Sequence, residues 1–487
     1  MTAKWAVLFS AILLGGCVFT SAKKPLVDAP EVNTPENWQQ LSNPADLSDQ
    51  GWLQDFADAS LKQLIAEAIS HNPDLQSTRA RLLAGLAEAE VAGADLKPQV
   101  DAELGASRSR RSSNGRHSIS DNVDGRLAFS WELDLWNKLS DSQQGAALAA
   151  GALRQDLTAA RLSLAANTAK AWFTGVEASI QLRLSEELVA NLEKNLGVLE
   201  EGYGSGIIDA LDIHLARANL AAEQGRLAVR KQAVGDSSRD LELLLGRYPA
   251  GQVNSATELP SLPAPVPAGL PSALLERRPD IRAAALRFDR SLALLSRAHK
   301  DRFPSLRLSG DVGINSDNLA DFLKGNSLIW TALASLTQPL FDGGRLEALE
   351  KRTVAEAEEA RAKYLSVVLQ AFSEVESALQ QEQQLLLEVA ALNLASEQSD
   401  FAESLAFEQY LSGLVDYITV LEAQRRAFNA RSTYLNSRNL LLQNRINLYL
   451  ALGGDFMAQQ TNTDLDSTSV DAESAGQALQ GRGSQSQ

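Results

Sequence analysis

Cysteine is almost missing from this chain, since Cys17 is the only one among 487 residues. A single thiol cannot form a disulfide within one chain, which excludes a disulfide-stabilised fold. Histidine is scarce as well, and the four present share no metal-ligand spacing: His71, His117, His214 and His299. The sequence therefore predicts no metal centre, and no cofactor except a lipid attached covalently to Cys17.

Net positive charge and long apolar runs are also missing. The formal net charge is −16 at pH 7, which argues against a nucleic-acid partner. Beyond the N-terminus no uncharged apolar run reaches about 18 residues, so no transmembrane helix is expected. We find no phosphate-binding glycine loop, no G-x-S-x-G motif and no converging nucleophile, base and metal set. An enzyme is therefore not predicted.

The one cysteine ends a short segment typical of export signals. Lys4 supplies positive charge, residues 6–14 are apolar, and Gly15 and Gly16 lead into Cys17. The sequence Leu-Gly-Gly-Cys resembles a bacterial lipobox, in which the chain is cut before the cysteine and the thiol carries a lipid. An ordinary signal peptide with an incidental cysteine is the alternative.

We therefore expect a signal peptide over 1–16 and a lipidated extension over 17–50. Val18 follows the cysteine instead of aspartate, which is typical of lipoproteins sorted to the outer membrane. A single lipid anchor holds a protein only modestly, so a second membrane attachment is expected elsewhere in the chain.

Proline is absent between Pro98 and Pro249 and again after Pro339. These stretches are rich in Ala, Leu, Glu, Gln and Arg, the composition of helices. They predict two long helical hairpins, over 139–246 and 343–453, each turning at glycine. A first helix of roughly 65 residues would be about 100 Å long.

The chain also repeats itself. The stretch "YGSGIIDAL" (203–211) matches "YLSGLVDYI" (410–418), and Pro98 matches Pro304 at nearly the same offset. An ordered series of such matches indicates a tandem duplication. The expected division is a first repeat over 51–248, a Pro-rich linker over 249–273, a second repeat over 274–456 and a disordered tail over 457–487.

A period of two replaces the helical period after each matched proline. Polar and apolar residues alternate over 99–107, 126–136 and 305–315, and less cleanly over 327–338. We expect β-hairpins over 99–136 and 305–341, with strands about ten residues long. The polar stretches 109–122 and 315–326 are predicted to be their loops.

Two structures fit these four strands. They could form part of a soluble sandwich with a buried apolar face, or transmembrane hairpins with that face toward lipid. A bilayer accepts strands only in a closed barrel, and four strands cannot enclose a lumen. Several chains would then pool them, two giving eight strands and three giving twelve. The lipobox favours the membrane alternative. The charged residues that would face the lumen are Asp101, Glu103, Glu132, Asp134, Arg307 and Asp311.

Several stretches together resemble the outer-membrane efflux protein family (TolC-like), in particular its lipoprotein branch that serves resistance-nodulation-division pumps. They include "FSWELDLWNKL" (129–139), "ERRPDIRAA" (276–284) and "PLFDGGR" (339–345). The resemblance implies a mainly α-helical fold with transmembrane β-strands. In it, four strands from each protomer of a homotrimer are pooled into a 12-stranded barrel, continued by a long periplasmic α-helical barrel.

The resemblance also implies a function without bond chemistry. Small molecules would pass from an inner-membrane pump and a periplasmic adaptor through the outer membrane of a Gram-negative bacterium. The protein itself would contact outer-membrane lipid. A duct for type I protein secretion and a structural lipoprotein that spans the periplasm are the alternatives. By resemblance, the adaptor would dock on Tyr203, Gly206, Ile207, Tyr410, Gly413 and Leu414. The periplasmic gate would involve Asp209, Asp212, Asp416 and Glu422.

Overall fold

The computed structural model describes residues 27–32, 34–39, 51–56, 58–113, 116–253, 256–262, 266, 268–269, 271–317 and 328–454. They form two compact units. Described residues of Arg79–Asp156 and Asp280–Val368 belong to the first unit, together with residues 27–32. The second unit comprises the described residues of Thr34–Thr78, Leu157–Pro279 and 369–454.

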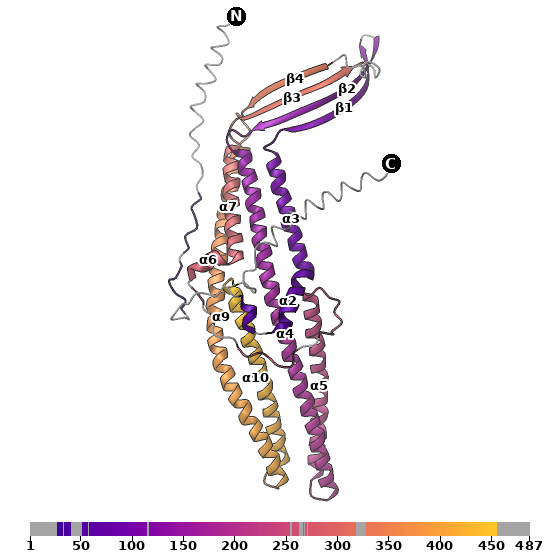
Figure 1. Ribbon diagram of the computed structural model, residues 1–487, viewed down its shortest axis with the longest axis vertical. Helices are drawn as coiled ribbons and strands as arrows, with labels where there is room; N and C mark the ends of the chain where they lie inside the picture. Colours follow the sequence, from indigo (N-terminus) through magenta and orange to yellow (C-terminus); the bar gives the residue numbers. More distant parts are fainter. Residues whose placement is uncertain are drawn as a thin grey trace. The chain divides into compact units, whose positions relative to one another are not determined.

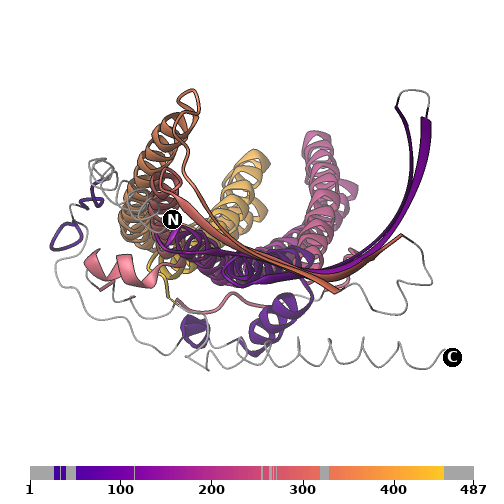
Figure 2. The same cartoon turned by 90° about the horizontal axis from the view of Figure 1, so that it is seen from above.

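The first unit carries one antiparallel sheet in the order β1-β2-β3-β4. Its strands are β1 (Gln99–Ser113), β2 (Arg116–Leu133), β3 (Ser305–Ser316) and β4 (Leu328–Thr337). Helices α3 (Pro73–Ala94) and α7 (Pro279–Lys300) precede the two hairpins. Figure 1 shows the four strands side by side, and Figure 2 shows the curvature of the sheet.

The register places the apolar positions of all four strands on one face. Val100 pairs with Phe129, Phe129 with Gly310, and Gly310 with Ala332. This face is open to solvent in the single chain, where Leu104 is 86% and Trp330 is 73% exposed. The described residues therefore do not form a sandwich that buries the apolar face, and this alternative is wrong for them.

One local prediction is also wrong. The polar stretch 109–122 is not a loop over most of its length, because β1 continues to Ser113 and β2 begins at Arg116. These strands have 15 and 18 residues, more than the ten expected. Continuous pairing between β1 and β2 extends through this stretch, although it has no sustained apolar face.

Long helices follow each hairpin. They are α4 (Lys138–Gly204) and α5 (Ala210–Leu244) in the first repeat, and α9 (Arg345–Leu411) and α10 (Tyr417–Ala451) in the second. The first helix of each pair has 67 residues and the second has 35. Equal lengths are the direct result of the duplication. None of the described helices combines the length and the apolar character needed to cross a bilayer.

Short elements complete the two units. Helix α2 (Ala59–His71) precedes α3, and α6 (Leu274–Arg277) precedes α7, while Trp52–Phe56 and Pro271–Ala273 form single 3₁₀ turns. In the first unit Val27 packs in a buried cluster with Phe288, Leu295 and Ala357. In the second unit Trp38 is buried and donates a 3.0 Å hydrogen bond to the Gly269 carbonyl.

Candidate functional site: the hairpin tips and the polar face of the sheet

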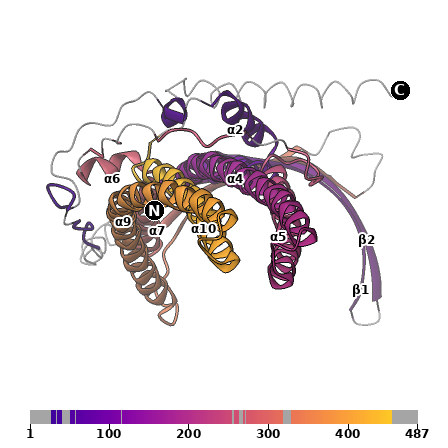
Figure 3. The same ribbon diagram turned by 90° about the horizontal axis from the view of Figure 1, so that it is seen from below.

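The two long hairpins end in turns that share one apolar core within the second unit. This core contains Leu199 of α4, Ile213 and Ala216 of α5, and Tyr417 and Val420 of α10. Both repeats contribute to it, and Figure 3 shows α5 and α10 as members of neighbouring hairpins. The residues predicted for the docking tip and the gate therefore lie around a common cluster.

Tyr410, near the end of α9, links the two hairpins. Its hydroxyl donates a 2.7 Å hydrogen bond to Oδ2 of Asp212, in the first turn of α5. Its ring lies 5.2 Å from that of Tyr417 between centroids. Burial and then the bond to Asp212 raise the pKa of Tyr410 far above its ordinary value, and burial raises the pKa of Tyr417 to about 12. Both phenols are protonated at neutral pH, so Tyr410 can act as the donor.

The turns themselves present apolar side chains to solvent. Ile207 is 83% exposed, Leu414 is 73% exposed and Tyr203 is 52% exposed. Each turn closes on a glycine in the left-handed region, Gly206 at φ +74° and Gly413 at φ +71°. A side chain there would strain the backbone although the space around both positions is open. Clustered exposed apolar groups at a turn fit a protein-binding surface.

The other three predicted gate carboxylates differ in their surroundings. Asp209 caps α5, where its side chain accepts a 3.2 Å hydrogen bond from a backbone N–H of the first turn. Asp416 is exposed at the corresponding cap of α10 but accepts no such bond. Glu422 pairs at 2.7 Å with both Arg426 and Arg425, which lower its pKa. The negative charge of Glu422 is thus balanced by two arginines of its own helix. This arrangement differs from those of Asp209 and Asp416.

Charged residues line the face of the sheet opposite the apolar one. Asp101 and Asp311 lie in one row, on either side of Ala128. One row further along, Arg126 Nε donates a 2.8 Å hydrogen bond to Glu103. Arg126 was not among the residues predicted to line this face. Its polar position in the alternating pattern of 126–136 was the signal that could have identified it.

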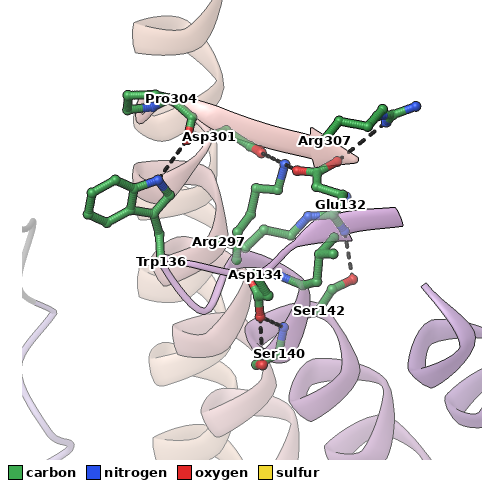
Figure 4. Close-up of polar contacts among 11 residues, drawn as sticks. Glu132, Asp134, Trp136, Ser140, Ser142, Arg297, Asp301, Pro304 and Arg307 are labelled. Carbon is green, nitrogen blue, oxygen red and sulfur yellow. Dashed lines mark hydrogen bonds and ion pairs between the residues drawn. The ribbon is translucent and has the colours of Figure 1, made fainter. Parts of the chain in front are cut away.

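The base of this face holds a second ion-pair group, drawn in Figure 4. Lys138 Nζ lies 2.6 Å from one carboxylate oxygen of Glu132, and Arg307 lies 3.4 Å from the other. The three residues come from α4, β2 and β3. Glu132 is therefore held between two cations where the strands meet the helix that follows them.

Asp134 is not a strand residue, and its prediction as a lumen-facing strand residue is wrong. Strand β2 ends at Leu133, and the Asp134 carboxylate accepts hydrogen bonds from the backbone of Leu139 at 2.9 Å and of Ser140 at 2.8 Å (Figure 4). The Ser140 hydroxyl adds a third at 2.7 Å. Partial burial opposes ionisation, but these bonds outweigh it and lower the pKa of Asp134. Its role is to cap the start of α4.

Two further expectations concern groups outside this geometry. Cys17, where a lipid is expected, lies outside the described residues, as does the tail after Gly454. Among the residues that the structure describes, no group of three or more His, Cys, Asp or Glu side chains is arranged to hold a metal ion.

An open sheet with one exposed apolar face, continued in each repeat by a long helical hairpin, defines a subunit of an outer-membrane channel. The family model described as "Outer membrane efflux protein" matches residues 64–247 and 270–454, and the chain belongs to this family. The two matches begin at 64 and 270, a spacing that agrees with the repeat found in the sequence. The family and the fold class expected by resemblance are confirmed, as is the outer-membrane location.

Individual relatives cover nearly the whole chain. The pyoverdine export outer membrane protein OpmQ of Pseudomonas putida is 32% identical over 439 residues, 87% of this chain and 92% of that protein. The probable outer membrane lipoprotein SilC of Salmonella typhimurium is 26% identical over 91% of this chain and 97% of its own. The open state of the Neisseria gonorrhoeae MtrE outer membrane channel superposes with a TM-score of 0.79 at 26% identity, over 90% of this chain and all of that one.

Proposed function

We propose that this chain is one protomer of a homotrimeric duct that passively conducts small molecules out of the cell, from an inner-membrane pump and a periplasmic adaptor. The observation that carries the proposal is the open four-stranded sheet. Its apolar face is exposed in the single chain, and its first and last strands, β1 and β4, each lack a second neighbour within the described sheet. Burying that face in lipid requires closing the sheet with strands from other copies.

Three copies are favoured over two by the family resemblance. The printed names of relatives support small-molecule export: OpmQ is a pyoverdine export protein. The inner-membrane pump of the resistance-nodulation-division type is supported by the resemblance carried by residues 276–284 and 339–345. The alternative of a water-soluble structural lipoprotein conflicts with the exposed apolar strand face.

The assembly is tested by extracting the full chain in detergent. Light scattering that separates protein from detergent is expected to give close to three times the mass of one mature chain. Deleting the protein is expected to raise intracellular accumulation of a fluorescent dye, and expressing it again should reverse this. A monomer that is soluble without detergent would refute the proposal, and unchanged accumulation across many compounds would refute the efflux role.

The tip is proposed as the adaptor-docking surface and the gate. Exposed Ile207 and Leu414 supply apolar contact area at the ends of the two hairpins. Immediately inside, the Tyr410–Asp212 hydrogen bond ties one hairpin to the other and would favour a closed tip. Replacing Ile207 and Leu414 with serine is expected to abolish adaptor co-purification while the trimer persists. Retained co-purification would exclude these two residues from docking.

Lipid attachment at Cys17 is proposed from the lipobox, and SilC is a relative named as a lipoprotein. Labelling cells with radioactive palmitate is expected to label this chain and to fail for Cys17→Ser. Equal labelling of the two proteins would refute the assignment.

A further inference from the structure

The apolar face of the sheet is a band of limited height. Cross-strand pairing orders it into six successive rows, from the row of Leu133, Leu306 and Leu336 at the helical end to the row of Ala106 and Val123. Five intervals of two residues, at about 3.4 Å per residue, cover about 34 Å along a strand. A strand tilt of about 40° reduces this to about 26 Å, close to the apolar band of a membrane barrel.

The β1–β2 ribbon continues beyond this band with a different composition. The next row on the same face is Arg108 paired with Asp121, and the row after it is Arg110 paired with Ile119. Within the described residues β3 ends at Ser316, opposite Val123, so it does not accompany the ribbon this far. Arg108 and Arg110 therefore lie directly beyond the apolar band and on the same, lipid-facing side of the sheet. They are at the end of the sheet away from the helices.

The arginine side chains are accessible. Arg108 is 73% exposed and its Nε lies 3.3 Å from Asp121, which is itself 48% exposed. Arg110 is exposed and faces the apolar Ile119 across the ribbon. Each row advances about 5 Å along the membrane normal at this tilt, which puts both guanidinium groups within about 10 Å of the hydrocarbon edge. This is the depth of lipid headgroups.

We propose that Arg108 and Arg110 form a binding site for the phosphate groups of anionic lipids in the outer leaflet. The inference rests on the membrane-spanning sheet of the proposed function. Guanidinium groups bind phosphate through paired hydrogen bonds, and their aliphatic stems remain over apolar surface while the charge reaches the headgroups. Continuity with the apolar band selects a lipid over a soluble ligand, because the site opens on the side that lipid covers.

Neighbouring residues supply matched controls. Arg111 follows in the same strand but lies on the opposite face, because successive strand residues alternate. Arg111 carries the same charge as Arg108 and Arg110, but it belongs to the face opposite theirs. Asp121 competes with phosphate for Arg108, so removing its charge should strengthen lipid binding.

The test titrates the purified full chain in detergent with lipid A, a lipid that carries two phosphates, and counts bound lipids by native mass spectrometry. Relative to wild type, the double variant R108Q/R110Q is expected to bind lipid A about tenfold more weakly. R111Q is expected to bind it like wild type, and D121N a few-fold more tightly. Dephosphorylated lipid A should bind all four proteins equally weakly, and millimolar inorganic phosphate should not displace lipid A.

Three results would overturn the site: wild-type affinity in the double variant, an equal loss in R111Q, or undiminished binding of dephosphorylated lipid A. Displacement by inorganic phosphate would show a free-phosphate site in place of a lipid site. The same spectra report the trimer, and if R108Q/R110Q fails to assemble, the exposed single variant R110Q is expected to lose about threefold. Dye accumulation in the same cells tests export separately, so a wild-type chain that exports dye but does not bind lipid A would refute only this inference.

Discussion

Tyr410 and Asp212 belong to different repeats, yet the hydroxyl of one donates a 2.7 Å hydrogen bond to the carboxylate of the other. The offset that relates Asp209 to Asp416 relates Tyr410 to Tyr203 and Asp212 to Thr419. Tyr203 is 52% exposed, and the position that would supply its carboxylate is a threonine. The two repeats thus have the same turn, but only Tyr410 of the second repeat has a carboxylate at the position that accepts its hydrogen bond.

Removing this hydroxyl should loosen the tip. Tyr410→Phe keeps the ring beside Tyr417 and leaves Asp212 without its donor. A hydrogen bond to a charged acceptor contributes about 1.5–3 kcal/mol, so the open state should be populated at least about tenfold more often. Single-channel conductance in planar bilayers is expected to rise accordingly.

Tyr203→Phe is the matched control for Tyr410→Phe, because it removes the same atom from the corresponding position of the other repeat. It should leave conductance unchanged. Equal increases in the two variants, or none in Tyr410→Phe, would show that the bond to Asp212 does not hold the tip.

Alkaline pH should act on the same bond. The pKa of Tyr410 is raised in the folded protein, so its contribution to stability is complete below the ordinary value of about 10 and is lost as the pH rises through the raised value. Conductance should therefore show no Tyr410-dependent change between pH 7 and pH 9, and an increase above about pH 10. Absorbance at 295 nm should show one late-titrating phenol that Tyr410→Phe lacks. An alkaline increase that persists in Tyr410→Phe would assign it to another group.

The cap of α4 should be sensitive to loss of its carboxylate. Asp134→Ala removes the acceptor for Leu139 N–H and Ser140 N–H and is expected to lower the free energy of unfolding by about 1–2 kcal/mol at pH 7. The pKa of Asp134 is lowered on folding, so its contribution is present above the ordinary value of about 3.8 and lost as the pH falls through the folded value. The difference between variant and wild type should shrink below about pH 4.

Denaturant unfolding at pH 7 and pH 3 measures this difference. Asp101→Asn, on the exposed polar face of the sheet, serves as the control and should have no measurable effect. If Asp134→Ala unfolds like wild type at pH 7, the capping role is wrong.

Two left-handed glycines separate backbone strain from steric clash. A Cβ on Gly206, at φ +74°, would meet nothing within 4 Å, whereas one on Gly246, at φ +71°, would lie 2.6 Å from the His71 carbonyl oxygen. Gly206→Ala should therefore cost only about 1–2 kcal/mol, the left-handed penalty. Gly246→Ala should cost about 3 kcal/mol or more. Thermal unfolding midpoints give the ranking, and equal midpoints would show that the His71 backbone yields to the added methyl group.

The strands were predictable because alternation alone determines which residues share a face. Val100, Phe129 and Trp330 each occupy an apolar position of a period-two pattern, and the pairing brings these positions together. The long hairpins were equally accessible, since proline is absent and a glycine marks each turn. These two patterns and the repeat predict the strands and the helical hairpins of each half, whereas the pooled trimeric barrel was expected from the family resemblance.

Features that depend on contact between distant segments were not predictable. The partner of Tyr410 lies 198 residues away, and nothing local to Asp212 indicates it. The strand character of 109–122 was hidden because this stretch lacks a sustained apolar face. Asp134 continues the alternation of β2 by one residue, so periodicity could not distinguish the last strand residue from a helix cap.

The matched helix lengths of the two repeats have a geometrical consequence. Helices of 67 and 35 residues on both sides of the duplication bring each chain two similar turns, joined by one apolar core. With two turns per chain, the proposed trimer would carry six on its rim. A partner that recognises a single turn could then bind in a stoichiometry of six to three, and the threefold symmetry of the duct would not by itself limit it to three.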